Sequence, residues 1–230
     1  MKKALVFSLI FIGAVIHSIA AYSQTVNDPE VRFGVKLGGN VATVNFDSTV
    51  NQALNPGFVG GLSFQHLNHK NLGIQLEVNY FQGGWKENID SVNNYQRRLH
   101  YLQVPFMTHA RIGQGKTRML LNFGPYFSVL LSDQKKINFS PEFPEQHYYR
   151  RDMDNIMEFG FCLGVGVSAN TGIGLFQLEG RANYSLTNTF NRPPETVFIT
   201  SNNLSAEVAL SYFIEAAKLK STAGKLLFWR

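Results

Sequence analysis

The chain alternates between apolar and polar residues in eight separate segments, and this period of two restricts its fold more than any other feature. Such a period places successive side chains on opposite faces of a β-strand. In one segment, for example, Leu76 and Val78 share a face, while Glu77 and Asn79 share the other. We therefore predict eight strands, each with an apolar and a polar face. They cover residues 31–41, 58–67, 72–81, 97–112, 118–131, 157–168, 173–186 and 204–213.

The segments between these strands alternate in length. Short turns rich in Gly and Asn follow the second, fourth and sixth strands, and longer polar segments follow the first, third, fifth and seventh. Transmembrane barrels sort their connections in this way, with short periplasmic turns and long external loops. A soluble sandwich has no reason to do so. The expected long loops are roughly residues 45–57, 84–96, 133–153 and 188–200.

An even number of strands, each about ten residues long with one apolar face, is typical of outer-membrane barrels. Closure is required because hydrocarbon cannot satisfy the hydrogen bonds of an open sheet edge. We predict an all-β fold, an eight-stranded antiparallel up-and-down transmembrane β-barrel. A soluble lipocalin-like barrel is the alternative. Aromatic residues near the strand ends are interpreted as girdles at the membrane interfaces: Tyr80, Phe81, Trp85, Tyr101, Tyr184 and Phe190.

Composition excludes several other classes of protein. Aromatic residues make up 13% of the chain, too much apolar surface for a disordered protein. The mean hydropathy of -0.10 argues against a helical protein with many membrane spans. Cys162 is the single cysteine, which excludes an intrachain disulfide and a CxxC zinc site. The net charge of +5 is not gathered in a basic run, so we expect no nucleic-acid partner.

The first residues have the organisation of a secretory signal. Lys2 and Lys3 precede an apolar stretch, and the small residues Ala21 and Ser23 suit a signal-peptidase site. An uncleaved membrane anchor is the alternative, although the apolar stretch is shorter than a spanning helix requires. We predict a signal peptide, the barrel and a C-terminal periplasmic tail at residues 1–23, 24–214 and 215–230, respectively.

The polar faces of the strands carry charges that would point into the barrel. An eight-stranded barrel is only just wide enough for its own side chains. Unpaired charges in such a place are costly, so we expect these groups to pair and to close the lumen. A narrow ion path or a proton-coupled site is the alternative interpretation. The predicted charges are Arg32, Lys36, Arg97, Arg111 and Arg181 as bases, with Glu77, Glu158, Glu179 and Glu207 as acids.

Motifs for catalysis or cofactor binding are weak. Gly164, Gly166 and Ala169 form a Gly-x-Gly-x-x-Ala string, but a turn follows them where a dinucleotide site needs a helix. His66 and His69 lie at the end of a strand and in its turn, so we expect no metal site there. No Gly-x-Ser-x-Gly motif occurs. We expect no cofactor and no enzymatic activity, with a lipid-modifying membrane enzyme as the alternative.

The expected loop at residues 133–153 contains the run Tyr148, Tyr149, Arg150 and Arg151. Aromatic and arginine side chains on a loop favour contact with protein, glycan or lipopolysaccharide phosphate. The alternative is a solvated external loop without a partner. The expected partners are outer-membrane lipid and other cell-envelope or secretion proteins, around a monomeric barrel in the outer membrane.

Three short strings resemble a known family. They are Gly34-Val-Lys-Leu-Gly-Gly-Asn40, Tyr101-Leu-Gln-Val-Pro-Phe106 and Gly124-Pro-Tyr126. They are similar to the small porin-like outer-membrane β-barrel family of Gram-negative bacteria that includes PorT. The resemblance implies an eight-stranded outer-membrane barrel, and its PorT member is associated with protein secretion. One departure is that sixteen residues, 215–230, follow Ile214, where such barrels usually end on an aromatic residue.

The leading functional hypothesis is a structural or interaction role in the outer membrane, as an accessory of protein secretion. The first alternative is a narrow channel or transport of small solutes, and the second is the lipid-modifying enzyme.

Overall fold

A computed structural model describes residues 29–46, 52–88, 93–140, 149, 152–190 and 201–216. The predicted signal peptide and residues 217–230 of the predicted tail lie outside the described residues. The strands are β1 (Glu30–Phe46), β2 (Gln52–Ala53), β3 (Asn55–His69), β4 (Leu72–Asn88), β5 (Asn94–Ile112), β6 (Thr117–Asn138), β7 (Met157–Asn170), β8 (Leu175–Asn188) and β9 (Ser201–Glu215). The described chain contains no helix that is long and apolar enough to cross a membrane.

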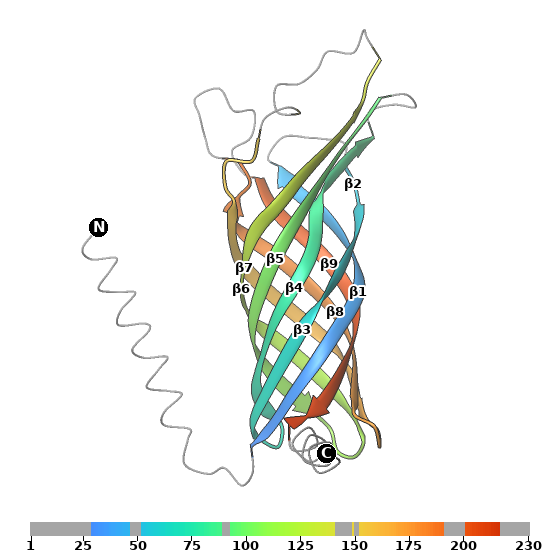
Figure 1. Ribbon diagram of the computed structural model, residues 1–230, viewed down its shortest axis with the longest axis vertical. Coiled ribbons are helices and arrows are strands. Elements are labelled where there is room, and N and C mark those ends of the chain that lie inside the picture. Colours follow the sequence, from blue (N-terminus) through green and yellow to red (C-terminus); the bar gives the residue numbers. More distant parts are fainter. Residues whose placement is uncertain are drawn as a thin grey trace, which may run out of the picture.

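Eight of these strands form a closed antiparallel ring (Figure 1). Each long strand pairs with the next one along the chain, and β1 pairs with β9 to complete the circuit. The pair β4–β5 joins the two ends of the sheet order, so the eight long strands leave no open edge. The two-residue strand β2 is an addition to β4 above this ring. The predicted eight-stranded up-and-down transmembrane barrel is confirmed.

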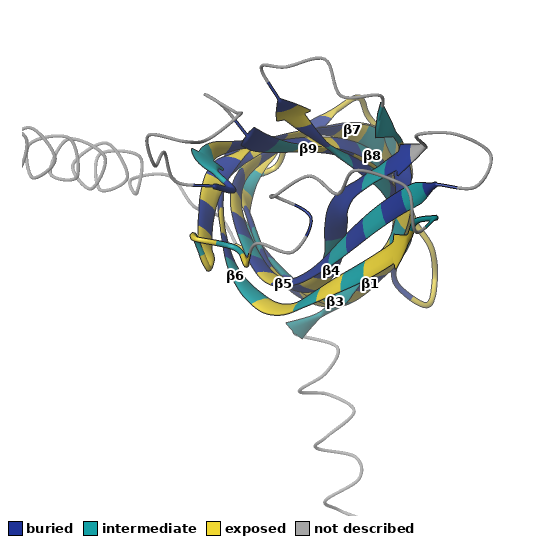
Figure 2. Ribbon diagram, turned by 90° about the horizontal axis from the view of Figure 1, so that it is seen from above, coloured by how far each residue is buried: buried dark blue, intermediate teal, exposed yellow. Residues whose placement is uncertain are grey.

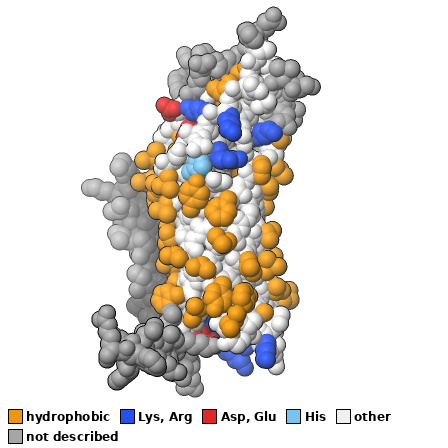
Figure 3. Space-filling view, turned by 45° about the vertical axis from the view of Figure 1, so that its right-hand side comes forward, with side chains coloured by type: hydrophobic (Ala, Val, Ile, Leu, Met, Phe, Trp, Pro, Cys, Tyr) orange, Lys and Arg blue, Asp and Glu red, His pale blue; other side chains and the backbone are white. Residues whose placement is uncertain are grey.

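The two faces of each strand differ as the alternation predicts. Figure 2 shows buried and exposed residues alternating along the strands when the ring is seen from above. On β7, Phe159, Phe161, Leu163 and Val165 are each more than two-fifths exposed, while Cys162 is buried. All eight long strands carry exposed apolar side chains. Figure 3 shows them as a hydrophobic belt on one side of the wall. An apolar belt on the outside of a closed barrel is the surface by which transmembrane barrels face lipid.

The strands are longer than predicted at the end that carries the long connections. β4 continues to Asn88 and β6 continues to Asn138, beyond the predicted ends at residues 81 and 131. Residues 84–88, 94–96 and 133–138, predicted to be loop, therefore belong to strands. In Figure 1, β4, β5 and β6 rise above the rest of the ring at this end. The short turns lie at the other end, as predicted.

Candidate functional site

The candidate site is the packed lumen, and all nine predicted interior charges lie inside it. The least buried of them, Glu158, is 9% exposed. Five form one group, which we call the central charge cluster: Lys36 on β1, Glu77 on β4, Glu179 and Arg181 on β8, and Glu207 on β9.

Arg181 and Glu77 form the ion pair at the middle of this cluster. Two guanidinium nitrogens of Arg181 donate to the two carboxylate oxygens of Glu77, at 2.8 and 2.7 Å. β4 and β8 are four places apart in the eight-strand ring, so the pair spans the diameter of the lumen. A bidentate arginine–carboxylate pair is among the stronger hydrogen-bonded arrangements in proteins. The pair therefore joins opposite walls through the space where a pore would run.

Lys36 completes the cluster from β1. Its Nζ donates to Glu207 Oε1 at 2.6 Å and to Glu77 Oε2 at 3.1 Å. Arg181 Nε also donates to Glu179 Oε1 at 2.9 Å. Two cations thus face three carboxylates. Each carboxylate contacts at least one cation, which is what burial of charge requires.

Glutamine side chains form a second polar layer next to this cluster. Gln65 on β3 donates to Gln75 on β4 at 2.8 Å and to Gln177 on β8 at 3.0 Å. Gln75 and Gln177 donate in turn to Glu77 and Glu179. All three glutamines are fully buried. The amides extend the closure toward the short-turn end and supply donors to two of the carboxylates.

Arg32 and Arg111 lie near the short-turn end and share one acid. Glu30 Oε2 accepts hydrogen bonds from Arg32 Nη2 at 2.6 Å and from Arg111 Nη2 at 3.2 Å. Glu30 was missed because it immediately precedes the predicted start of the first strand at residue 31. The contacts of Glu30 show that the inward-facing polar positions continue to the first residue of β1.

Arg97 lies at the opposite end, among aromatic rings. Its guanidinium carbon lies 5.5 Å from the centres of the Trp85 and Phe190 rings, within range of a cation–π contact. Its Nε donates to Asp133 Oδ1 at 2.9 Å. Sequence reasoning does not find Asp133, because it treats residues 133–138 as loop and because the extra residue Leu131 in β6 reverses which positions face inward. The aromatic group around Arg97, which we call the mouth cluster, consists of Phe46, Trp85, Tyr95, Tyr149 and Phe190.

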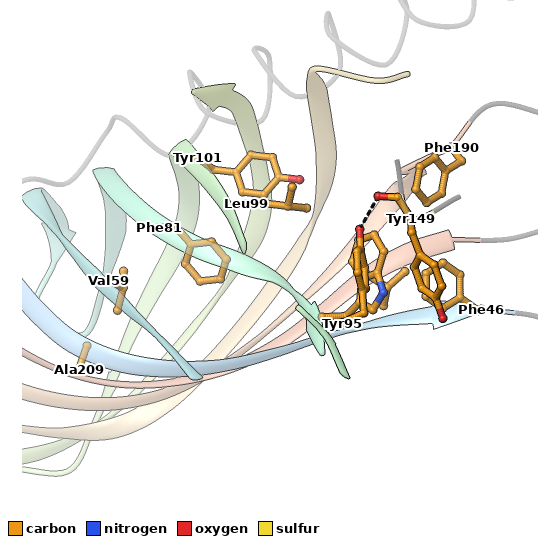
Figure 4. Packing of buried hydrophobic residues seen from close by; sticks show 11 residues of the cluster. Phe46, Val59, Phe81, Tyr95, Leu99, Tyr101, Tyr149, Phe190 and Ala209 are labelled. Atoms are coloured by element: carbon orange, nitrogen blue, oxygen red, sulfur yellow. Dashed lines mark hydrogen bonds between the residues drawn. The ribbon is translucent and has the colours of Figure 1, made fainter. Parts of the chain in front are cut away.

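The mouth cluster overturns part of the girdle prediction. Phe81, Trp85, Tyr101 and Phe190 are at most 6% exposed and point inward, whereas Tyr80 and Tyr184 face outward at 37% and 41%. Tyr80 and Phe81 are adjacent in one strand, so the strand's own period of two forbids that both face lipid. The aromatic residues fill the barrel at its long-loop end, as Figure 4 shows for the inward-facing rings.

Tyr149 also differs from the prediction of an external contact loop. It is 2% exposed, its hydroxyl donates to Glu87 Oε2 at 3.0 Å, and its carbonyl accepts from the Tyr95 hydroxyl at 3.3 Å (Figure 4). Its side chain is therefore part of the closure and unavailable to an external partner. Tyr148, Arg150 and Arg151 lie outside the described residues.

Glu158 lies between the two clusters without a cationic partner among the described side chains. It accepts hydrogen bonds from the Tyr126 hydroxyl at 2.7 Å and from Asn203 Nδ2 at 2.6 Å. The adjoining cavity has a volume of about 10 Å³, room for about one water molecule. Side chains therefore occupy nearly all of the lumen at this level.

Gly164 shows how tightly the centre is packed. A Cβ atom at this position would overlap the Glu179 carboxylate. The glycine therefore leaves the room that an acid of the central charge cluster occupies, a role that accounts for the Gly-x-Gly string without a dinucleotide. Within the described part of the chain, no group of three His, Cys, Asp or Glu side chains could hold a metal ion.

Solved structures of outer-membrane barrels resemble this chain. Ail of Yersinia pestis is 12% identical with a TM-score of 0.41, over 80% of this chain and 99% of Ail. OprG of Pseudomonas aeruginosa is 9% identical with a TM-score of 0.44, over 85% and 99%. Neisserial surface protein A is 13% identical with a TM-score of 0.41, over 80% and 96%. No curated protein matches the chain.

The sequence model of one family, described as the outer membrane protein beta-barrel domain, matches residues 22–191. The chain belongs to this family. The match runs from before β1 to just beyond β8 and so includes most of the ring. Membership of this family places the protein in the outer membrane, as predicted. Eight of the nine predicted lumen charges lie within the matched residues, and Glu207 lies beyond them.

Proposed function

We propose that this outer-membrane barrel has a structural or interaction role, acting through its lipid-facing wall and its long-loop end. The observation that carries the proposal is the ion pair between Glu77 and Arg181, which crosses the lumen between opposite strands. A barrel closed by its own side chains has no continuous water path for a solute. Contact with lipid and with other envelope proteins is then the function that the remaining surfaces support.

Two separate layers close the lumen, which strengthens the case against transport. The central charge cluster is held by ion pairs between buried groups, and the mouth cluster by packed rings around Arg97. Moving Arg181 aside would leave Glu77 and Glu179 without their strongest partner, so opening the centre is costly. Opening the mouth would expose Trp85, which is fully buried. A solute would need both rearrangements at once.

Single-channel recording in planar bilayers tests the proposal. The expected result is no stable conductance above the background of the bilayer. A small, steady, cation-selective current would favour the narrow channel instead, since the central charge cluster contains three carboxylates and two cations. A large stable conductance would overturn the closed-barrel proposal altogether.

We also infer that the role is not catalytic. In the described part of the chain no Ser or Cys side chain hydrogen-bonds to a histidine: His109 contacts Asn122 and His100 contacts Tyr80. Cys162 is buried, with its thiol against the Gly124 carbonyl at 3.3 Å. The test is turnover of phospholipid and lipid A by the reconstituted protein. Product formation above that of an empty vesicle would establish the lipid-modifying enzyme.

A role as an accessory of protein secretion is the finer form of the proposal. It is supported by the strings in β1, β5 and β6 that resemble the family that includes PorT. The expected result of deleting the gene is loss of a set of proteins from the culture medium, restored by the full chain. If the set of secreted proteins is unchanged, the secretory role is rejected and the structural role still stands.

A further inference from the structure

The outward face of β4, β5 and β6 changes from apolar to basic above the hydrophobic belt. Two rows of paired residues cross these strands there: Lys86, Gln96 and Lys136 in one, and Gly84, Arg98 and Gln134 in the next. We call Lys86, Arg98 and Lys136 the basic ledge. Figure 3 shows Lys and Arg side chains gathered at this level, above the belt.

The three cations lie close enough to act on one ligand. Arg98 is the diagonal neighbour of both Lys86 and Lys136 on adjacent strands. Diagonal neighbours across a sheet are about 7–8 Å apart at the backbone, within reach of long side chains. The alternate positions of β4 and β5 face the lumen instead, and they place Trp85, Glu87 and Arg97 inside the barrel.

The ledge lies just beyond the membrane's hydrocarbon layer. On β5, the outward residues from Leu102 to Ile112 are apolar apart from Thr108. Leu102 and Ile112 are 40% and 56% exposed. Ten residues of a strand tilted by about 40° rise about 25 Å, the height of a lipid-facing belt. Arg98 is four residues above Leu102, or about 10 Å higher. That height corresponds to lipid headgroups and not to acyl chains.

The charges of the ledge are not neutralised within the described chain. None of its three cations forms an ion pair with a described residue. The Arg98 guanidinium makes a long hydrogen bond, 3.4 Å from Nη2 to the Pro56 carbonyl, and its Nε is buried without a partner. The acids on the same stretches of β4 and β6 face inward, where Glu87 accepts from Trp85 and Asp133 pairs with Arg97.

We propose that the basic ledge binds a phosphorylated lipid headgroup in the membrane leaflet at the long-loop end. Three unpaired cations complement one or two phosphates, and Arg98 supplies the planar set of donors that phosphate geometry favours. The ledge continues the lipid-facing belt upward, so a lipid whose tails cover Leu102 and Phe106 presents its headgroup to Arg98. This continuity favours a lipid over a free anion. The inference rests on the proposed contact function of the wall.

Lipid retention by the full chain tests the proposal. The protein is reconstituted in phosphatidylcholine nanodiscs that contain diphosphoryl lipid A, and co-purified lipid is counted by native mass spectrometry after release into detergent. The ledge variant is Arg98→Gln with Lys136→Gln. The matched control is Lys70→Gln with Lys116→Gln, which removes the same charge at the short-turn end. The shift between boiled and unboiled samples in SDS verifies that each variant is folded.

Wild type and control are expected to retain lipid A, and the ledge variant to bind it about thirtyfold more weakly, since each surface cation contributes about 1 kcal/mol toward anionic lipid. Dephosphorylated lipid A should not be retained. Equal retention by wild type and ledge variant would overturn the proposal, as would an equal loss in the control. Complete displacement of lipid A by inorganic pyrophosphate would show that the ledge binds free anions and not a lipid. Bilayer conductance is measured on the same samples, so failure of the closed-barrel proposal is observed separately.

Discussion

The central charge cluster and the mouth cluster close the same lumen by opposite chemistry. In the centre, lipid covers the outside of the wall and the inward positions carry charge, as at Glu77 and Arg181. At the mouth, the outward positions of β4 carry Lys86, and the inward position beside it carries Trp85. The strand keeps its alternation throughout. What reverses is the polarity of the two faces, because the wall leaves the hydrocarbon layer and enters the hydrated headgroup region.

Because of this reversal, the two layers resist opening through different interactions. The centre depends on pairing of buried charges, whose removal one at a time leaves an uncompensated partner. The mouth depends on apolar burial and on one buried cation, Arg97, whose acidic partner Asp133 is 16% exposed. The centre should therefore be sensitive to the loss of a charge, and the mouth to the loss of a ring.

The largest expected effect is on conductance when both layers are removed. Trp85→Ala alone leaves the centre closed, and Glu77→Ala with Arg181→Ala alone leaves the mouth closed. We expect neither variant to conduct. The triple variant should conduct steadily in planar bilayers, because the two layers act in series. A current in either partial variant equal to that of the triple variant would show that one layer alone closes the lumen.

The next effect is the loss of Arg181 from the centre. Arg181→Met leaves Glu77 and Glu179 facing each other with only Lys36 nearby, so the free energy of unfolding should fall by about 3–5 kcal/mol. Urea unfolding of the protein in phospholipid vesicles measures it. The triple variant Arg181→Met, Glu77→Gln and Glu179→Gln should recover much of the loss. No recovery would mean that packing, and not charge, holds the centre together.

The sequence was sufficient to place the nine interior charges, because inside the membrane one rule governs every strand. Apolar residues face lipid, so their neighbours face the lumen. The girdle prediction is wrong at the mouth, because it places Trp85 and Tyr101 at the lipid interface from their chemistry and ignores their positions in the strands. Counting positions from Glu77 along β4 would have placed Trp85 inside. On β4, which has no register shift against β5, position along the strand is thus a better guide than side-chain chemistry.

Long-range partners were harder to predict than faces. Lys36 on β1 donates to Glu207 on β9, a strand that is separated from β1 by most of the chain. Their contact depends on the stagger of the ring as it closes, which no local pattern encodes. Asp133 was lost for a different reason. β6 continues beyond the membrane, where polar residues on both faces look like a loop.

A smaller effect is expected when the mouth loses its acid. Asp133→Asn removes the carboxylate from Arg97 but leaves the guanidinium stacked between Trp85 and Phe190. Because Asp133 is partly exposed, water replaces some of the interaction, and the unfolding free energy should fall by about 1–2 kcal/mol. The same urea titration measures it. A loss as large as that of Arg181→Met would make the mouth depend on charge as strongly as the centre.

The smallest effect lies outside the membrane, where Lys135 donates to Asp152 at 2.7 Å. This hydrogen bond, with the charge of Lys135, lowers the pKa of the Asp152 carboxyl. A lowered pKa stabilises the fold above the carboxyl's unfolded value, and the contribution disappears as pH falls through the folded value. Nuclear magnetic resonance titration of the carboxyl carbon should show its pKa rise toward that of an ordinary aspartate in Lys135→Gln. Lys136→Gln is the control, because its side chain lies on the outward face. An unchanged titration in Lys135→Gln would show that the exposed pair is absent in solution, in contrast to the buried pairs of the lumen.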